Sequence, residues 1–359
     1  MGGRDRERLE AVRRDLGAPA EIVVADALDG DAMAAMARRT HAVVSTVGPY
    51  ARYGTPLVAA CADAGTDYAD LTAEALWMRS TVDAFHDRAV QSGARIVHAC
   101  GFDSLPSDLG TWRLHTEALQ RYGRPCRQVV HAFGPMAGGL SGGTVASAFD
   151  LIAQAARDPE TRRALMDPDL LAPGAPASPD PLGPWWPQRH AGLDGWTTPF
   201  VMAASNAKVV RRTRALLGEP WGDDVRYLER LRVPTWARAA TVGLMSVAAP
   251  VLLAPAFVRR LAAGVLPEPG QGPSEAVRKR GYFRSTLVGH VDGVREPVVG
   301  HTRADLDPGY GATARMLAEV GLGLAQREFD VGGGVLTPAV VGGQRLVDRL
   351  GEVGIRIGT

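Results

Sequence analysis

Residues 41–71, HAVVSTVGPYARYGTPLVAACADAGTDYADL, contain one complete strand–helix–strand unit. The run His41–Thr46 is short and apolar, as a buried strand is, and the turn residues 47–49 end it. Thr55–Ala64 reads as a helix, and Asp67–Leu71 as a second short strand. Two strands joined by a helix run parallel and cross over with a right hand, so this stretch predicts a parallel α/β sheet.

The same alternation extends to both sides of this unit. Before it, we expect helices at Arg6–Leu16 and Asp31–Arg39, with a strand at Glu21–Ala25 between them. After it, a helix from about Glu74 to Ser92 leads to a strand at Arg95–Ala99. Short strands separated by helices are typical of a doubly wound α/β fold of the Rossmann type, in which ligands bind beyond the carboxyl ends of the strands.

The expected beginning of such a sheet does not precede these elements in the sequence. A dinucleotide-binding sheet should open with an apolar strand, a Gly-x-Gly-x-x-Gly turn and a helix. This chain opens on Gly2-Gly3-Arg4, where the ribose-recognising end of the second strand belongs. We therefore expect an N-terminally truncated Rossmann sheet whose first strand and glycine loop are encoded upstream. The alternative, that residues 1–3 have no such meaning, stays open.

The middle of the chain changes in character, and this predicts a second domain of α+β type. We divide the chain into a Rossmann domain at 1–127, a second domain at 128–304, and a C-terminal segment at 305–359 that packs back on the first domain. The second domain holds a Pro-rich loop at 158–190 and an apolar segment at 239–258. Long irregular loops of this kind are commonly lids or disordered segments.

The apolar segment Ala239–Val258 has 20 residues without a charge, which is enough to span a bilayer. Pro250 and Pro255 each remove a backbone donor and interrupt a spanning helix. We expect a helical hairpin instead, which either lines a pocket in the core or lies on a lipid surface without crossing it. Arg238 and Arg259 flank the segment, where they could meet anionic head groups.

Composition excludes several classes of function. A formal net charge of +1 offers no general attraction to nucleic acid. The three cysteines, Cys61, Cys100 and Cys126, form no CxxC pair; they predict a reducing, cytoplasmic compartment, with Cys100 as a buried apolar side chain. The eight histidines form neither HExxH nor HxH, so we expect no metal site.

Small and polar residues directly follow three of the predicted strands. They are residues 45–50 (STVGPY), 70–74 (DLTAE) and 100–108 (CGFDSLPSD), and Asp26 follows a fourth strand. Each cluster alone can be a turn or a helix cap, but their shared place at strand ends favours a ligand site at this edge of the sheet. Gly138–Gly143 could likewise cradle an anion or form only a tight turn.

Two longer stretches, STVGPYARYGTPLVAACADAGTDYADLTAE at 45–74 and ARIVHACGFDSLPSDLG at 94–110, strongly resemble the saccharopine dehydrogenase-like oxidoreductases. More narrowly, they resemble the branch of trans-acting enoyl reductases. The resemblance continues through GGLSGGTVAS, KVVRRTRALL, PEPGQGPS, DPGYGATA and GVLTPA, and so covers nearly the whole chain. It departs at the N-terminus, where family members carry a Gly-Ala-x-Gly-x-x-Gly-type turn before the motif that Gly3-Arg4 matches.

The resemblance implies NADPH-dependent reduction of a carbon–carbon double bond in a lipid or polyketide acyl chain, presented by a partner synthase in glycolipid biosynthesis. By motif position, Arg4 would meet the 2′-phosphate of NADP, and Asp26 would meet the adenine. The residues that would border the nicotinamide are Thr46, Val47, Gly48 and Pro49. The candidate proton donors are Tyr50, Tyr53 and Ser104.

Two other functions stay open at this point. The chain could be a non-catalytic, membrane-associated partner of a lipid-synthesis complex, or an amino-acid reductase of the saccharopine type. The amino-acid reductase needs several charged groups to grip its substrate, whereas the middle domain is mostly apolar or rich in Gly and Pro. We consider a homodimer as the assembly, and a cytoplasmic location with peripheral contact at the plasma membrane.

Overall fold

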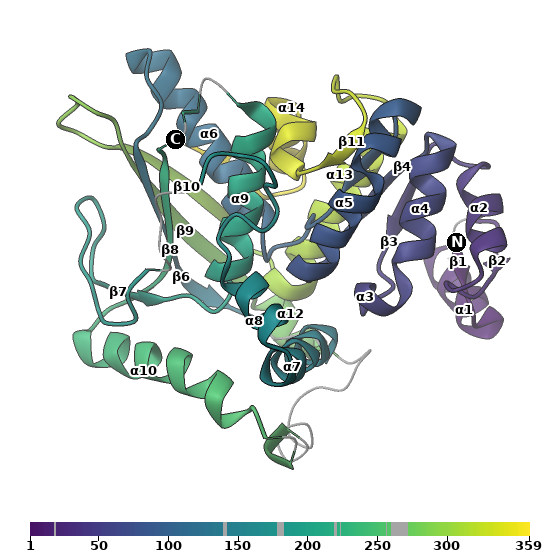
Figure 1. The fold of residues 1–359 in the computed structure, drawn as a ribbon, viewed down its shortest axis with the longest axis horizontal. Helices are drawn as coiled ribbons and strands as arrows, with labels where there is room; N and C mark the ends of the chain where they lie inside the picture. Colours follow the sequence, from purple (N-terminus) through teal and green to yellow (C-terminus); the bar gives the residue numbers. More distant parts are fainter. Residues whose placement is uncertain are drawn as a thin grey trace.

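A computed structural model gives the fold of the chain. It describes residues 1–17, 19–138, 142–177, 183–218, 221–222, 224–255, 257–259 and 272–359. The strands among these residues form three sheets, of two, four and six strands, which lie side by side from the N-terminal end of the molecule to the opposite end (Figure 1). The glycine-rich turn expected at 138–143 lies partly outside the described residues, so its role stays a prediction.

The four-stranded sheet and its helices consist of β3 (Ala42–Ser45), β4 (Asp67–Asp70), β5 (Arg95–Val97), β11 (Gly334–Leu336), α4 (Thr55–Ala64), α5 (Ala75–Ser92) and α13 (Thr313–Ala325). The strands are parallel and lie in the order β11–β5–β4–β3. Ala69, Ile96 and Val97 are fully buried, as expected of parallel strands covered on both faces. The predicted parallel sheet is confirmed, and so is the buried position of Cys100.

Local signals place the helices of this sheet. The helix predicted at Thr55–Ala64 has those bounds, and Gly65 ends it in the left-handed conformation (φ 69°). Gly93 ends α5 in the same way (φ 82°). Glycine adopts this conformation without the steric cost of a side chain, so it is the usual residue beyond a helix C-terminus.

The two-stranded sheet lies at the N-terminal end and consists of β1 (Gly2–Gly3) and β2 (Val23–Val24), joined by α1 (Arg6–Leu16) and followed by α2 (Gly30–Ala37). Its strands are parallel, and α2 packs against α4 of the larger sheet. The strand β2 is shorter than the predicted Glu21–Ala25. The described strands of the two sheets are not hydrogen-bonded to each other, so the single sheet predicted from the sequence is divided here.

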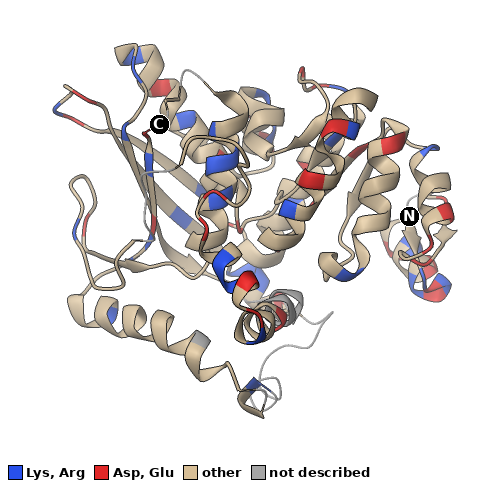
Figure 2. Ribbon diagram, viewed as in Figure 1, with Lys and Arg blue, Asp and Glu red and all other residues tan. Residues whose placement is uncertain are grey.

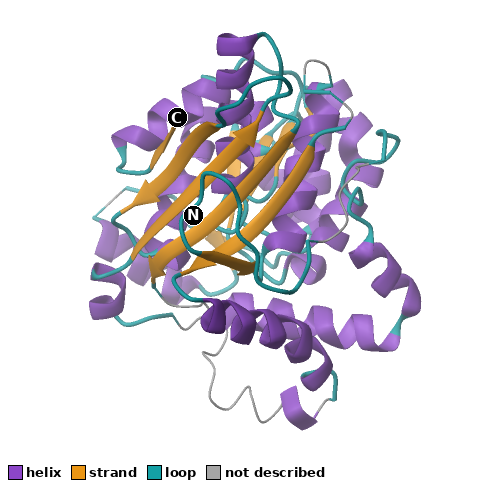
Figure 3. Ribbon diagram, turned by 90° about the vertical axis from the view of Figure 1, so that its left-hand side faces the viewer, coloured by secondary structure: helices purple, strands orange, loops and turns teal. Residues whose placement is uncertain are grey.

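The six-stranded sheet consists of β6 (Gln128–Ala137), β7 (Trp196–Pro199), β8 (Arg226–Val233), β9 (Tyr282–His290), β10 (Val298–Ala304) and β12 (Arg356–Gly358). Its order is β12–β10–β9–β6–β8–β7, and only β6 and β8 run parallel. The helices α6 (Leu105–Tyr122), α9 (Ala203–Leu217) and α14 (Pro338–Glu352) contact it. They lie behind the sheet in Figure 3, which shows the strands face on.

The C-terminal segment joins the two larger sheets. It supplies β11 to the parallel sheet and β12 to the mixed sheet; α13 precedes β11 in the chain, and α14 connects the two strands. One apolar cluster extends through this junction and includes Val97 of β5, Phe133 of β6, Met316 of α13 and Leu346 of α14. Burial of apolar surface therefore fixes the two sheets relative to each other.

One expectation for the second domain was wrong in detail. The Pro-rich loop at 158–190 contains a helix, α8 (Pro159–Met166), which begins at the capping carboxylate of Asp158. The first part of the apolar segment belongs to α10 (Trp236–Leu252), which continues for two residues beyond Pro250; a turn follows, and residues 257–259 are again helical. The hairpin expected at 239–258 extends over residue 256, which lies outside the described residues, so it stays a prediction. No helix among the described residues is long and apolar enough to cross a membrane.

Candidate active site

The carboxyl ends of β3, β4 and β5 open at one edge of the parallel sheet. After β3, residues 46–49 turn through a cis peptide before Pro49 and enter α3 (Tyr50–Tyr53). Glu74, which follows β4, accepts hydrogen bonds from the main-chain N–H groups of Tyr50 (2.9 Å) and Ala51 (2.8 Å). A carboxylate here satisfies N–H groups that the first turn of a helix leaves free. The clusters predicted after β3 and β4 are thus joined, and residues 46–48 remain exposed to a ligand.

Tyr50 and Tyr53, two of the candidate proton donors, differ in their surroundings. The Tyr50 side chain is buried, its ring stacks on Trp77 with 5.4 Å between centroids, and its hydroxyl donates to the main-chain oxygen of Ser45 (3.0 Å). Burial and the nearby carboxylate of Asp70 raise the pKa of Tyr50 well above its usual value. Tyr53 lies one turn further on and is half-buried.

A buried polar pair that the sequence did not single out lies behind Tyr50. His98, just after β5, places Nδ1 2.8 Å from an oxygen of Asp70 and Nε2 2.9 Å from the hydroxyl of Thr81. The His98 ring also meets Trp77 edge-on, with 5.0 Å between centroids. Because Trp77 packs on Tyr50, this pair supports the wall of the candidate site from inside. Asp70 belongs to the predicted strand-end cluster, but nothing in the sequence pattern marks His98, which lies in an apolar run.

The adenosine end of a dinucleotide would lie beyond β1 and β2. Arg4 follows β1, is exposed, and lines a hollow of about 430 Å³ together with Arg8. Two guanidinium groups beside one hollow fit the oxygens of a phosphate. Asp26 follows β2 and is also exposed, with one carboxylate oxygen accepting from the N–H of Leu28 (2.9 Å). The residues present therefore fit the phosphate-bearing ribose of NADP.

Ser104, the third candidate donor, belongs to a buried network between the two larger sheets. Its hydroxyl donates to the side-chain oxygen of Asn206 (2.9 Å), whose amide donates to Glu229 (2.7 Å). The second carboxylate oxygen of Glu229 accepts from Ser107 (2.8 Å) and Tyr227 (2.6 Å). The network therefore fastens the segment after β5 to α9 and β8. Its members come from three distant parts of the sequence, so sequence patterns could not reveal it.

Burial controls the charge of Glu229. Desolvation raises the pKa of Glu229 to about 7, even though three hydrogen-bond donors stabilise its ionised form. The carboxyl group therefore holds its proton more tightly in the folded protein than in the unfolded chain, where its pKa is about 4.3.

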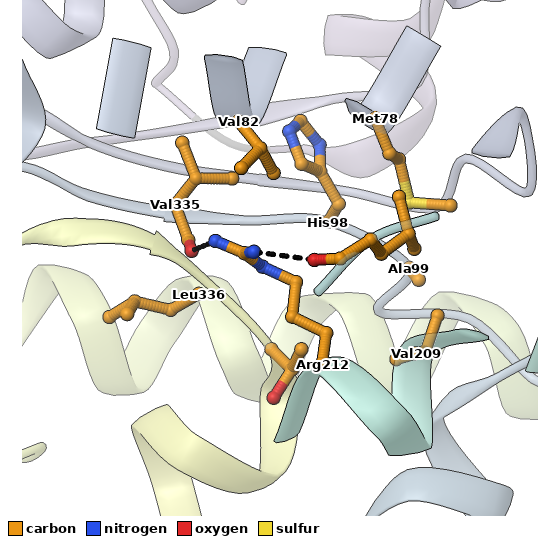
Figure 4. A pocket seen from close by; sticks show the side chains of 10 residues that line it. Met78, Val82, His98, Ala99, Val209, Arg212, Val335 and Leu336 are labelled. Atoms are coloured by element: carbon orange, nitrogen blue, oxygen red, sulfur yellow. Dashed lines mark hydrogen bonds between the residues drawn. The ribbon is translucent and has the colours of Figure 1, made fainter. Parts of the chain in front are cut away.

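A small cavity lies at the junction of β5, α9 and β11, shown in Figure 4. Its volume is about 10 Å³, enough for one water molecule and far too little for a cofactor. Arg212 lines it and donates to the main-chain oxygens of Leu171 (2.7 Å) and Val335. This cavity is a packing feature where the Pro-rich segment meets the parallel sheet, and the candidate site lies at the exposed strand ends instead.

The histidine, cysteine and acidic side chains of the described residues form no group that could hold a metal ion. The exposed residues at the strand ends fit a nucleotide.

The fold and the strand-end site define a dinucleotide-dependent oxidoreductase. Residues 1–97 match the family described as the saccharopine dehydrogenase NADP binding domain. NADP is therefore the cofactor, and the protein is an NADP-dependent oxidoreductase, as predicted.

The chain belongs to the trans-acting enoyl reductase branch of the saccharopine dehydrogenase-like oxidoreductases. It is 42% identical to the Mycobacterium tuberculosis protein Rv2449c, whose name calls it a trans-acting enoyl reductase, over 100% of this chain and 90% of the relative. It is 39% identical to the trans-acting enoyl reductase of Mycobacterium leprae, with the same shares covered. The family predicted from the sequence motifs is confirmed.

A solved structure supports the fold. The apo saccharopine dehydrogenase (L-Glu forming) of Saccharomyces cerevisiae superposes with a TM-score of 0.50, covering 99% of this chain and 92% of that one. The sequence identity is 12%, so this similarity concerns the fold alone.

The raised pKa of Glu229 predicts how stability depends on pH. Between about pH 4.5 and pH 7 the folded protein keeps this proton and the unfolded chain releases it, so this carboxyl group makes the protein less stable as pH rises. Glu229→Gln removes that dependence. We expect the free energy of unfolding of the variant, relative to wild type, to rise across this interval by up to about 3 kcal/mol.

Urea unfolding at several pH values measures this difference directly. Asp108 titrates in the same range but is present in both proteins, so it cancels in the comparison. A difference between the two proteins that stays constant from pH 4.5 to pH 7.5 would contradict the assignment.

Proposed function

We propose that this protein reduces a carbon–carbon double bond in a lipid or polyketide acyl chain with NADPH. The acyl chain would be presented by a partner synthase in glycolipid biosynthesis. The observation that carries this proposal is similarity over the whole chain to two relatives named trans-acting enoyl reductases. The word trans-acting supports the idea that the substrate arrives on another protein.

The strand ends would hold the cofactor in an extended conformation. Arg4 and Arg8 would bind the 2′-phosphate at the end of β1, and Asp26 would meet the adenine beyond β2. The turn after β3, with Thr46, Val47, Gly48 and Pro49, would border the nicotinamide. When bound, NADPH supplies the hydride for the β carbon of the unsaturated thioester. The capping bonds from Glu74 hold this turn in place, so the wall for the nicotinamide is formed in advance.

Tyr53 is the best candidate to protonate the α carbon. A proton donor must reach the substrate with its hydroxyl group. Tyr50 and Ser104 are buried, and each hydroxyl donates to an acceptor inside the protein. Tyr53 is half-buried on the same short helix, directly after the turn that would border the nicotinamide. Tyr50 and Ser104 then hold the site together, and Tyr53 supplies the proton.

Aromatic side chains form a buried apolar cluster beside this edge. Phe102, which precedes Ser104, packs on Phe283 (4.7 Å between centroids) and on Phe133 (5.7 Å). Phe133 stacks in turn on Phe200, which is half-buried. Of the four rings, Phe200 is the most accessible, and an apolar core directly behind the strand ends suits a hydrocarbon chain better than a charged amino acid. It favours the enoyl reductase over the saccharopine-type reaction.

We further propose that the reaction takes place in the cytoplasm, at the inner face of the plasma membrane. A lipid product and a synthase-bound intermediate both suit this location.

The assignment of Arg4 predicts a change in cofactor preference. Arg4→Ala should weaken binding of NADPH by about tenfold or more, because a charge-assisted hydrogen bond to phosphate is lost. Binding of NADH should stay nearly unchanged. Fluorescence titration of both nucleotides measures the two effects. Arg13→Ala is the matched control. Arg13 is an exposed arginine on α1, the helix that follows Arg4, and it does not line the hollow. Equal losses for both nucleotides would mean that Arg4 supports the fold instead.

The assignment of Tyr53 predicts a loss of rate without a loss of binding. Tyr53→Phe should lower kcat with an enoyl thioester by about 100-fold, the usual contribution of a positioned acid. The KM for NADPH should not change, because the hydroxyl acts only on the substrate. Tyr122→Phe, an exposed tyrosine on α6, is the control. Unchanged turnover in Tyr53→Phe together with loss in Ser104→Ala would assign the donor role to Ser104.

A further inference from the structure

The helix α10 carries its large apolar side chains on the side that faces solvent. Leu244, Val251 and Leu252 are 59%, 72% and 58% exposed, and they recur at helical spacing with the exposed Met245 and Val247. Ordinary surface helices show the opposite pattern, with the apolar stripe turned to the core. Packing among the described residues therefore does not explain the outward stripe of α10.

The inner side of α10 explains how the helix can be held this way. Ala239 and Gly243 are buried, and a side chain at Gly243 would collide with the main-chain oxygen of Trp185. The main-chain oxygen of Ala239 accepts a hydrogen bond from Thr198 of β7 (2.7 Å). Small residues and a polar bond thus attach the helix to the sheet, and the large apolar residues are free for another partner.

Two tryptophans lie on the segment against which α10 packs. Trp185 and Trp186 are 50% and 53% exposed, and the buried side chain of Arg230 donates to the main-chain oxygen of Trp186 (3.0 Å) and to that of Pro184. The main chain of this segment is therefore fixed while both indoles remain accessible. Trp236, at the start of α10, is also exposed. Tryptophan is the side chain that favours the boundary between water and lipid.

The charged residues of α10 and of the segment directly after it are of one sign. Between Thr235 and Arg259 the sequence has no Asp or Glu, and Figure 2 shows no acidic position along the helix. Arg238 lies in the first turn, and Arg259 follows the helix, where one nitrogen of its guanidinium group donates to the main-chain oxygens of Leu253 (2.8 Å) and Ala254. Basic residues at the border of an exposed apolar stripe complement the anionic head groups of a bilayer. Binding to a protein partner would not require that this segment lack acidic residues.

From these observations we infer that α10, together with Trp185, Trp186 and Trp236, is a docking surface for an anionic lipid bilayer. The outward side chains would enter the boundary between head groups and acyl chains, with the helix lying along the membrane plane. This inference identifies the surface by which the protein would contact the plasma membrane. It rests on the proposed function only in taking that membrane as the bilayer that is bound. Binding itself is a property of the surface and needs neither cofactor nor synthase.

Sedimentation with vesicles tests this inference on the full chain. The wild-type protein should bind vesicles that contain phosphatidylglycerol more tightly than vesicles of phosphatidylcholine alone, and salt should weaken the binding. The double variant Leu244→Glu/Val251→Glu should bind at least about tenfold more weakly, because charge replaces two inserted apolar side chains. Both positions point away from the protein, so the fold should be kept, which circular dichroism and thermal unfolding check.

A matched control separates this effect from a general effect of added charge. Val90→Glu changes an exposed valine (52%) on α5, far from α10 in the fold, and should bind vesicles as wild type does. Reduction of a soluble short-chain enoyl thioester should be the same in all three proteins, so failure of the proposed reaction and failure of docking are distinguishable. Wild-type protein that ignores both vesicle types would overturn the inference. So would a double variant that binds vesicles normally, even if it lost activity on a synthase-bound substrate, because the surface would then serve a protein partner.

Discussion

The parallel direction of β3, β4 and β5 is the constraint on which the candidate site depends. Parallel strands end at the same edge of a sheet, so the segments that follow them must meet there. The hydrogen bonds from Tyr50 and Ala51 to Glu74 are a direct consequence, since they join segments that follow β3 and β4. The exposed turn at 46–49 is thereby fixed before any ligand binds.

The second sheet gives this edge its chemical character. The C-terminal segment contributes a strand to each larger sheet, and a shared apolar core sets their relative position. This brings the aromatic side chains of β6 and β9 next to the loop after β5. The junction of the two sheets therefore places a buried apolar core directly behind the loop after β5.

Much of the fold could be predicted from the sequence because its signals are local. The helices at Arg6–Leu16 and Thr55–Ala64 have the predicted bounds. Gly17 and Gly65 directly follow their last residues and end them in the left-handed conformation. The network around Glu229 could not be predicted, because its members meet only when α6, α9 and β8 pack together.

Transfer of deuterium tests the central claim most directly. NADPH labelled with deuterium at the transferable position of the nicotinamide is incubated with the protein and an α,β-unsaturated acyl thioester, and the product is analysed by mass spectrometry. We predict a saturated thioester that carries one deuterium at the β carbon, with the proton at the α carbon derived from water. Absence of label from every acyl thioester, together with labelled product from an imine formed between an amino acid and a keto acid or aldehyde, would contradict the account.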